Sequence, residues 1–344
     1  MTRLLDRPSA GPARSPNTPS VPDENPWIDS TPAAEHLRQH CAAVRLQLRW
    51  WGTSRTLSAR QKSDLIGDAG VDSRFLRASK QIIDRAHPTL RLLTGIRGRI
   101  TGTWRRLGLP FVEPGVRLIP RPLIPEFEQA MELYRQELAA GVEELSEAFP
   151  GLLEAARERL GRFFNPEDYP AEVRDLFTVA WEYPSIEPPS YLLALDPGLY
   201  RRELRRAGER LDQAVELAQS ALTEEFGRLV EHLAERLTDE AGGRPKTFRD
   251  SSLENLLEFF GRFRQAGLRG SDDLDRLVSQ AQDLVRGIRP GDLRKSEGLR
   301  ERIAGDLTRV GCQLETLLVD RPRRKIVRTG MSDHPLMPGE AVVA

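Results

Sequence analysis

The sequence predicts a mainly α-helical protein: an elongated, coiled-coil-like antiparallel helical hairpin, accompanied by helical bundles and a small minor β-sheet. Apolar residues recur every three or four positions through two long segments, 125–164 and 198–239, which is the period of a helix with one buried face. Charged residues make up 30% and hydrophobic residues 39% of the 344 residues, a balance typical of long exposed helices. Only a few short segments show the alternation of a strand.

The chain begins with a segment that is unlike a folded domain. Residues 1–32 contain seven prolines and many Ser, Asn and Asp residues, so they predict a disordered leader. They lack the apolar core of a secretory signal. A basic helical region with short strands is expected over 33–122.

Three short stretches predict the small sheet. VRLQLRW (44–50) alternates apolar and polar residues, although the same residues are also compatible with an extension of a helix from Ala33. VRLI (116–119) and FTVAWEY (177–183) are the other strand candidates, and the three are expected to pair.

Helices are expected around these strands. Ser58 and Asp72 are placed as helix N-caps, and a further helix is expected from Pro88 to Leu107. The last of these contains Gly95, Gly98 and Gly102 on one face. The pattern from Gly95 to Gly98 matches the GxxG of nucleic-acid-clamping loops, but glycines that allow close helix packing are the favoured interpretation.

The long hairpin is assigned to 123–240. In its second arm, 198–239, the apolar residues are spaced by about 3.7 positions, which indicates a nearly straight helix of roughly 60 Å. Such a helix should pair along its length, most simply with 125–164. A break or kink is expected at Pro150.

A Pro-rich joint, 179–197, connects the two arms. Pro188 and Pro189 favour a rigid extended path, and Asp196 is expected to cap the second arm. The joint is interpreted either as a stiff connector or as an exposed aromatic docking loop. The candidate docking residues are Trp181, Tyr183 and Tyr191.

The remainder, 241–328, predicts a cluster of shorter helices that follows a Gly- and Pro-containing loop at 241–247. Residues 321–328, RPRRKIVR, are either a short edge strand or a basic extension, and 329–344 predict a disordered tail.

The net charge is zero but unevenly distributed. Residues 36–122 contain 17 Lys or Arg against 5 Asp or Glu, whereas 123–200 contain 5 against 16. These segments either attract each other or bind different partners. The basic segment also carries the alternative of nucleic-acid binding, because cations alternate with Trp rings between Arg45, Arg49 and Arg55.

A second cationic group lies at the start of the long second arm, where positive charge opposes the helix dipole. It requires either acids of the same chain or an external anion as compensation. The favoured acids are Glu154, Glu158, Glu167 and Asp168. The candidate anion or partner contacts are Arg201, Arg202, Arg205 and Arg206.

Signatures of catalysis and cofactor binding are not found. The sequence has no phosphate-binding GxxxxGK[ST] loop and no GxSxG nucleophile turn. His36 and His40 lie one helical turn apart but lack a third ligand nearby, so no metal site is expected. The two cysteines, Cys41 and Cys312, favour a reduced cytoplasmic setting, and no apolar run is long enough for a membrane span.

Three stretches resemble a family of uncharacterised long-helix bacterial proteins: FTVAWEYPSIEPPSY, FRDSSLENLLEFFGRFR and LLVDRPRRKI. The resemblance covers about 36–328. It implies a gene neighbourhood with MoxR-type AAA+ ATPases and von Willebrand factor A proteins, and it assigns no catalytic residue.

We therefore expect a non-enzymatic cytosolic interaction or scaffold protein without cofactors, acting as an adaptor subunit in an AAA+ ATPase-associated assembly. Protein partners, including further copies of the chain, fit the long amphipathic helices better than a membrane does. Nucleic-acid binding through the basic 36–122 surface is the alternative.

Overall fold

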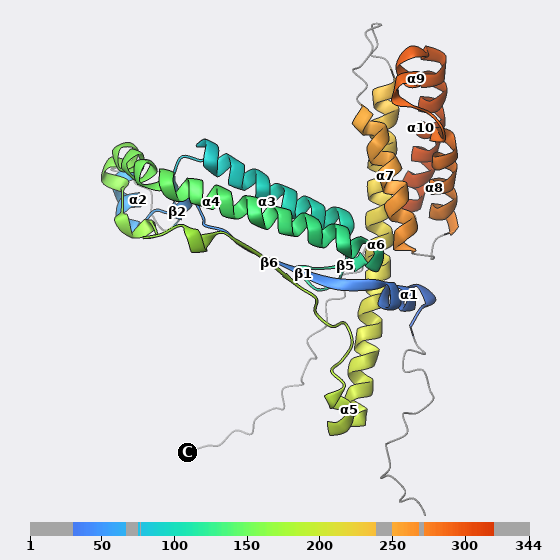
Figure 1. Cartoon of the computed structure of the whole chain (residues 1–344), viewed down its shortest axis with the longest axis horizontal. Helices are drawn as coiled ribbons and strands as arrows, with labels where there is room; N and C mark the ends of the chain where they lie inside the picture. Colours follow the sequence, from blue (N-terminus) through green and yellow to red (C-terminus); the bar gives the residue numbers. More distant parts are fainter. Residues whose placement is uncertain (1–29, 67–74, 76, 239–249, 268–271, 320–344) are drawn as a thin grey trace, which may run out of the picture. The chain divides into compact units, whose positions relative to one another are not determined.

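Apolar periodicity places most of this chain in helices, and the computed structural model confirms a mostly helical protein with a small antiparallel sheet (Figure 1). The structure describes residues 30–66, 75, 77–238, 250–267 and 272–319. It divides into two compact units, Met1–Glu216 and Leu217–Ala344. The expected leader and tail lie outside the described residues, except that Thr31 and Pro32 begin the first helix.

The helices follow the sequence in this order: α1 (Pro32–His40), α2 (Ala59–Ile66), α3 (Pro88–Leu107), α4 (Ile124–Leu160), α5 (Tyr191–Leu195), α6 (Pro197–Leu237), α7 (Asp250–Ala266), α8 (Asp272–Val285), α9 (Pro290–Lys295) and α10 (Glu297–Val319). The strands are β1 (Cys41–Arg49), β2 (Ser54–Thr56), β3 (Ser79–Gln81), β4 (Leu109–Pro110), β5 (Val116–Pro120) and β6 (Thr178–Glu182).

The main sheet confirms the three predicted strands. Its order is β4-β5-β1-β6, with antiparallel neighbours. The first half of β1 pairs with β5, placing Ala43 opposite Leu118, and the second half pairs with β6, placing Gln47 opposite Ala180. Because α1 ends at His40 and β1 starts at the next residue, the alternative of a helical extension through 44–50 is wrong.

A helical hairpin is present in the first unit, but α3 is the partner of α4. Arg106 contacts Glu126 near one end of the pair and Arg99 contacts Glu137 further along, so the two helices run antiparallel. The expected pairing of 125–164 with 198–239 is not confirmed, because α4 buries its apolar face against α3 and the sheet.

Gly141 is the glycine that allows this close approach. A Cβ atom there would lie 2.9 Å from Leu93 Cδ2. A Cβ atom at Gly95, Gly98 or Gly102 would meet nothing within 4 Å, so the packing role expected for these three α3 glycines is wrong.

Replacing Gly141 by leucine should therefore lower the free energy of unfolding by about 1–3 kcal/mol, because the added side chain forces α3 and α4 apart. Urea unfolding followed by circular dichroism measures the loss. Gly151→Leu is the matched control, since the same helix offers open space there and no loss is expected. Equal stabilities of the two variants would contradict the proposed contact.

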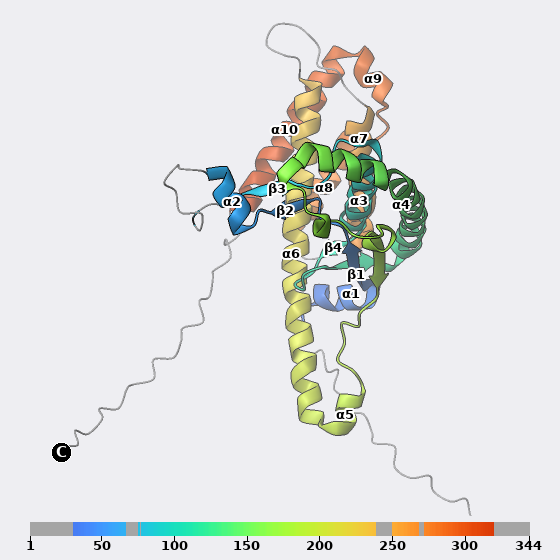
Figure 2. The same cartoon turned by 90° about the vertical axis from the view of Figure 1, so that its left-hand side faces the viewer.

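Pro150 lies inside α4, which continues through it to Leu160 as one helix. The helix changes direction in this part of the chain (Figure 2), as expected where a proline removes a backbone donor and its ring crowds the preceding turn. Of the two outcomes that the sequence left open, a break or a kink, the structure has the kink.

The long helix α6 begins as the sequence predicts. Asp196 Oδ1 accepts a hydrogen bond of 2.7 Å from the Gly198 backbone N–H, and Pro197 is the first helical residue. In the first unit, Thr31 at the start of α1 donates to Asp212 through its backbone N–H (3.1 Å) and its hydroxyl (2.6 Å). These bonds fix α1 beside this part of α6.

The second half of α6 belongs to the second unit, where its buried face meets α7. Phe226 stacks on Phe259 with 5.3 Å between ring centroids. Glu225 forms an ion pair with Arg262, with 2.6 Å between Glu225 Oε1 and Arg262 Nη2. In the second unit α6 thus packs against α7 and α10, and α10 runs antiparallel to it (Figure 1).

One of the two predicted N-cap residues of the basic region lies in the described part of the chain. Ser58 is confirmed as the cap of α2, because its hydroxyl accepts from the Gln61 N–H while the Gln61 side chain accepts from the Ser58 N–H. Asp72, the loop 241–247 and the basic stretch 321–328 lie outside the described residues.

Candidate functional site

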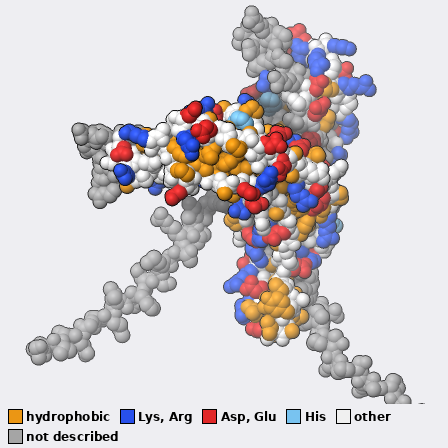
Figure 3. All heavy atoms as spheres, turned by 60° about the vertical axis from the view of Figure 1, so that its left-hand side comes forward, with side chains coloured by type: hydrophobic (Ala, Val, Ile, Leu, Met, Phe, Trp, Pro, Cys, Tyr) orange, Lys and Arg blue, Asp and Glu red, His pale blue; other side chains and the backbone are white. Residues whose placement is uncertain are grey.

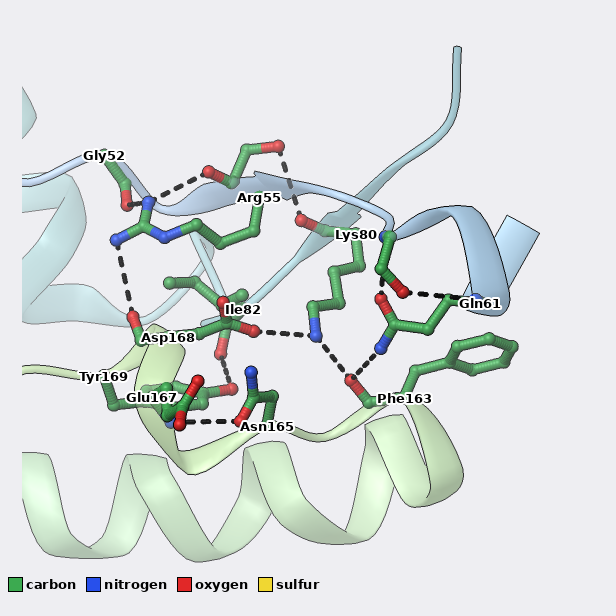
Figure 4. Close-up of polar contacts among 12 residues, drawn as sticks. Gly52, Arg55, Gln61, Lys80, Ile82, Phe163, Asn165, Glu167, Asp168 and Tyr169 are labelled. Atoms are coloured by element: carbon green, nitrogen blue, oxygen red, sulfur yellow. Dashed lines mark hydrogen bonds and ion pairs between the residues drawn. The ribbon is translucent and has the colours of Figure 1, made fainter. Parts of the chain in front are cut away.

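A polar cluster around the buried Lys80 joins the paired strands β2 and β3 to the segment that follows α4 (Figure 4). Lys80 on β3 is only 8% exposed. Its ammonium lies 2.7 Å from Asp168 Oδ2 and donates a 2.5 Å hydrogen bond to the Phe163 carbonyl. An ammonium this buried needs such partners, because an unpaired charge in the interior is costly.

The surrounding groups in the cluster contact backbone carbonyls. Arg55 donates to the carbonyls of Gly52 (2.7 Å) and Asp168 (3.4 Å), and the Tyr169 hydroxyl donates to the Ile82 carbonyl (2.6 Å). Burial and, second, the Asp168 charge raise the pKa of Tyr169. Arg55, which the sequence predicts as a partner contact, therefore binds backbone carbonyls of its own chain. The cluster links strands β2 and β3 to the segment 163–169 after α4.

The basic and acidic segments contact each other at several places. Arg45 pairs with Glu182 across the β1–β6 edge and also contacts Glu113, and these two carboxylates raise its pKa. Each such exposed pair contributes little by itself. The pairs that link 36–122 to 123–200 include Arg38–Glu187, Arg45–Glu182, Lys80–Asp168, Arg99–Glu137 and Arg106–Glu126.

The aromatic residues of the nucleic-acid alternative belong to the core. Trp50 packs edge-on against Phe177 with 5.1 Å between ring centroids, and Trp51 is buried against Phe149. Arg49 is exposed and has no ion-pair partner among the described residues. Stacking of bases needs open ring faces, which these two tryptophans do not provide.

The α6 arginines lie in the first turns of the helix, as predicted, and are exposed. Arg206 pairs with Glu203 one turn away at 2.5 Å. Two of the acids expected to compensate the cluster pair elsewhere: Glu154 contacts Arg157, and Asp168 contacts Lys80. The expected compensation by these two acids is therefore wrong. The complete α6 cluster is Arg201, Arg202, Arg205 and Arg206.

The Pro-rich joint separates its aromatic residues into two environments. Trp181 Nε1 donates a 2.7 Å hydrogen bond to Glu128 Oε1, and the Tyr183 hydroxyl donates to the same oxygen. Burial raises the pKa of Tyr183, and the bond to Glu128 raises it further. Tyr191, by contrast, is 63% exposed. The structure thus holds Trp181 against α4, bonds Tyr183 to α4 while leaving that side chain 44% exposed, and leaves Tyr191 open to solvent.

An exposed apolar surface surrounds Tyr191. Leu195 is 73% exposed and Leu193 is also exposed. Together Tyr191, Leu193 and Leu195 form what we call the α5 tip, and hydrophobic side chains gather at this end of the first unit (Figure 3). Sequence reasoning missed the two leucines. The available signal was YLLAL between Pro189 and Asp196, an apolar run too short to bury all its faces.

A groove of about 400 Å³ lies beside the tip, between the joint and the first part of α6. Ile186, Pro188 and Leu192 line one side, and Leu199 lines the other. Arg210 closes the groove on α6. Glu187 and Glu203 also line the groove, so the apolar surface is that of the tip, and the groove beside it carries both signs of charge.

Metal and membrane signals were also sought in the described part of the chain. Its residues include no group of three His, Cys, Asp or Glu side chains placed to hold a metal ion. The rings of His36 and His40 lie 4.3 Å apart, and burial raises the pKa of the neighbouring Cys41 thiol to about 12. Among the helices described, none is long and apolar enough to cross a membrane.

No family model, no curated protein and no solved structure matches this chain. The resemblance to the long-helix bacterial family therefore stays a prediction.

Proposed function

We propose that this protein is a non-enzymatic interaction or scaffold protein of the cytoplasm, and that it binds a protein partner through the α5 tip. The observation that carries the proposal is the exposure of Tyr191, Leu193 and Leu195 together at one end of the first unit. Contiguous exposed apolar side chains of this kind mark interaction surfaces in soluble proteins.

The neighbouring charges define the partner. Arg201, Arg202 and the rest of the α6 cluster begin within one or two turns of the tip. Tyr and Arg are the residue types that dominate binding energy at interfaces. A partner segment that combines apolar side chains with Asp or Glu fits both the tip and the arginines.

Protein partners are better supported than nucleic acid. Arg45 and Arg106 in the basic segment already contact acids of the same chain, and Trp50 and Trp51 pack in the core. With the family resemblance, these observations favour an adaptor subunit in an AAA+ ATPase-associated assembly.

Leu195→Asp should weaken partner binding by about 30-fold, which corresponds to the loss of a hot spot of about 2 kcal/mol. Stability should stay unchanged, since the side chain is 73% exposed. Light scattering and sedimentation of the purified protein with the products of its neighbouring genes measure the binding. Leu133→Asp is the matched control, because that leucine is 52% exposed on α4, away from the tip.

Two results would argue against the proposal. One is a complex with unchanged affinity in Leu195→Asp. The other is binding to single-stranded RNA at physiological salt that is lost when Arg45, Arg49 and Arg55 become Glu, which would replace protein docking with the nucleic-acid alternative.

A further inference from the structure

A second and larger groove lies within the second unit, between the second half of α6 and α10. Its volume is about 810 Å³. Val230, Leu307 and Leu314 are buried side chains that line it, and Gly227 and Gly311 leave room between the two helices. An apolar floor between two helices is the usual receptor for an extended or helical segment.

The rim of this groove is acidic. Glu224, Glu231, Glu235 and Glu315 are all exposed lining residues, whereas Arg228 is the one cation among the lining residues described. Within the described part of the chain, Glu231, Glu235 and Glu315 make no ion pair. An occupant should therefore be positively charged along its edges and apolar at its centre.

The chain itself supplies such a segment next to the groove. Helix α10 ends at Val319, four residues beyond Glu315. Residues 320–328, DRPRRKIVR, contain five cations, one acid and the apolar pair Ile326 and Val327. Nine extended residues reach about 30 Å, and the groove follows α6 over roughly 21 Å from 224 to 238.

We propose that residues 320–328 fold back along α10 and occupy the α6–α10 groove. The basic side chains lie over the acidic rim, and Ile326 and Val327 fill the space that Gly227 and Gly311 leave between the two helices. Tethering favours this occupant over a segment of another molecule, because a short connection gives an effective concentration on the order of millimolar. The inference concerns the second unit and does not depend on the α5 tip.

The rate at which the Cys312 thiol is modified reports whether the groove is occupied. Cys312 is exposed and lines the groove, whereas Cys41 is buried with a raised pKa of about 12 and reacts slowly. The full-length protein is treated with N-ethylmaleimide, a neutral thiol reagent, and modification at Cys312 is followed by mass spectrometry. A tail bound with sub-millimolar intrinsic affinity protects Cys312 by about fivefold.

Arg323→Glu/Arg324→Glu/Lys325→Glu should therefore accelerate Cys312 modification by about fivefold. Nearby cations favour the reactive thiolate, so their loss by itself cannot produce this acceleration. Adding Glu231→Arg and Glu235→Arg should restore slow modification. Arg201→Glu/Arg202→Glu/Arg205→Glu makes the same change in net charge in the first unit and should leave the rate unchanged.

Modification of the tail variant at the native rate would overturn the proposal. Protection that appears only at higher protein concentration would also overturn it, because the occupant would then be the tail of a second copy.

Discussion

Replacing Phe226 by alanine is expected to lower the free energy of unfolding of the second unit by about 3–5 kcal/mol. The ring is fully buried and stacks on Phe259, with Phe260 edge-on at 6.2 Å between centroids. Truncation removes both the buried apolar area and the aromatic contacts between α6 and α7, and it leaves a cavity that the helices only partly close.

Guanidinium unfolding and hydrogen exchange of the α7 amides measure this loss. Exchange is needed beside the global transition, because a chain of two units need not unfold in one step. Phe75→Ala is the control: that ring is 87% exposed, so a change below about 0.5 kcal/mol is expected. Native exchange rates in α7 of the Phe226 variant would show that the stack is not part of the core.

The second large effect is expected at Lys80. Lys80→Met should cost about 3 kcal/mol of stability, because it leaves the buried Oδ2 atom of Asp168 without its cation. Asp168 Oδ2 is buried, and no described group besides the Lys80 ammonium, 2.7 Å away, compensates its charge. Thermal and urea unfolding of the first unit measure the loss.

The double variant Lys80→Met/Asp168→Leu distinguishes an uncompensated carboxylate from lost packing as the cause of the destabilisation. Replacing both members of a buried ion pair with apolar side chains of similar size is often close to neutral, so the double variant should recover most of the lost stability. Lys295→Met, at an exposed position on α9, should change stability by less than about 0.5 kcal/mol. A double variant as unstable as Lys80→Met would show that lost packing, not the stranded carboxylate, causes the effect.

Local patterns predicted the elements well. Alternation in 44–50 and in 177–183 identified β1 and β6, because the strand period of two is a property of neighbouring residues. Asp196 followed by Pro197 identified the start of α6 for the same reason. These signals need no knowledge of which segments meet in space.

The partner of each helix was the part that could not be predicted. An apolar stripe defines the buried face of a helix, and the α3 stripe of Leu93, Ile96 and Ile100 is as compatible with α4 as the stripe of α6 is. The glycine at the α3–α4 contact, Gly141, lies in a run of ordinary helix formers. Its role depends on where Leu93 projects, which the sequence does not show.

The candidate site was predicted in part. Tyr191 and the α6 arginines are exposed, whereas Trp181 is held by Glu128, a residue more than fifty positions earlier in the chain. The exposure of the α5-tip leucines was not predicted, because a short apolar run is normally buried and the sequence does not show which segments cover it.

The contacts between the basic and acidic segments have a consequence for synthesis. During translation, residues 36–122, with 17 cations against 5 acids, are synthesised before their partners in 123–200. At roughly 5–20 residues per second, the acidic stretch takes on the order of 4–16 s to be made. For that interval the nascent chain is a polycation beside ribosomal RNA, to which such charge binds without regard to sequence. We therefore expect the later segment to act as an intramolecular counterion that competes with RNA for the nascent chain, and translation speed across 123–200 to set how long the exposure lasts.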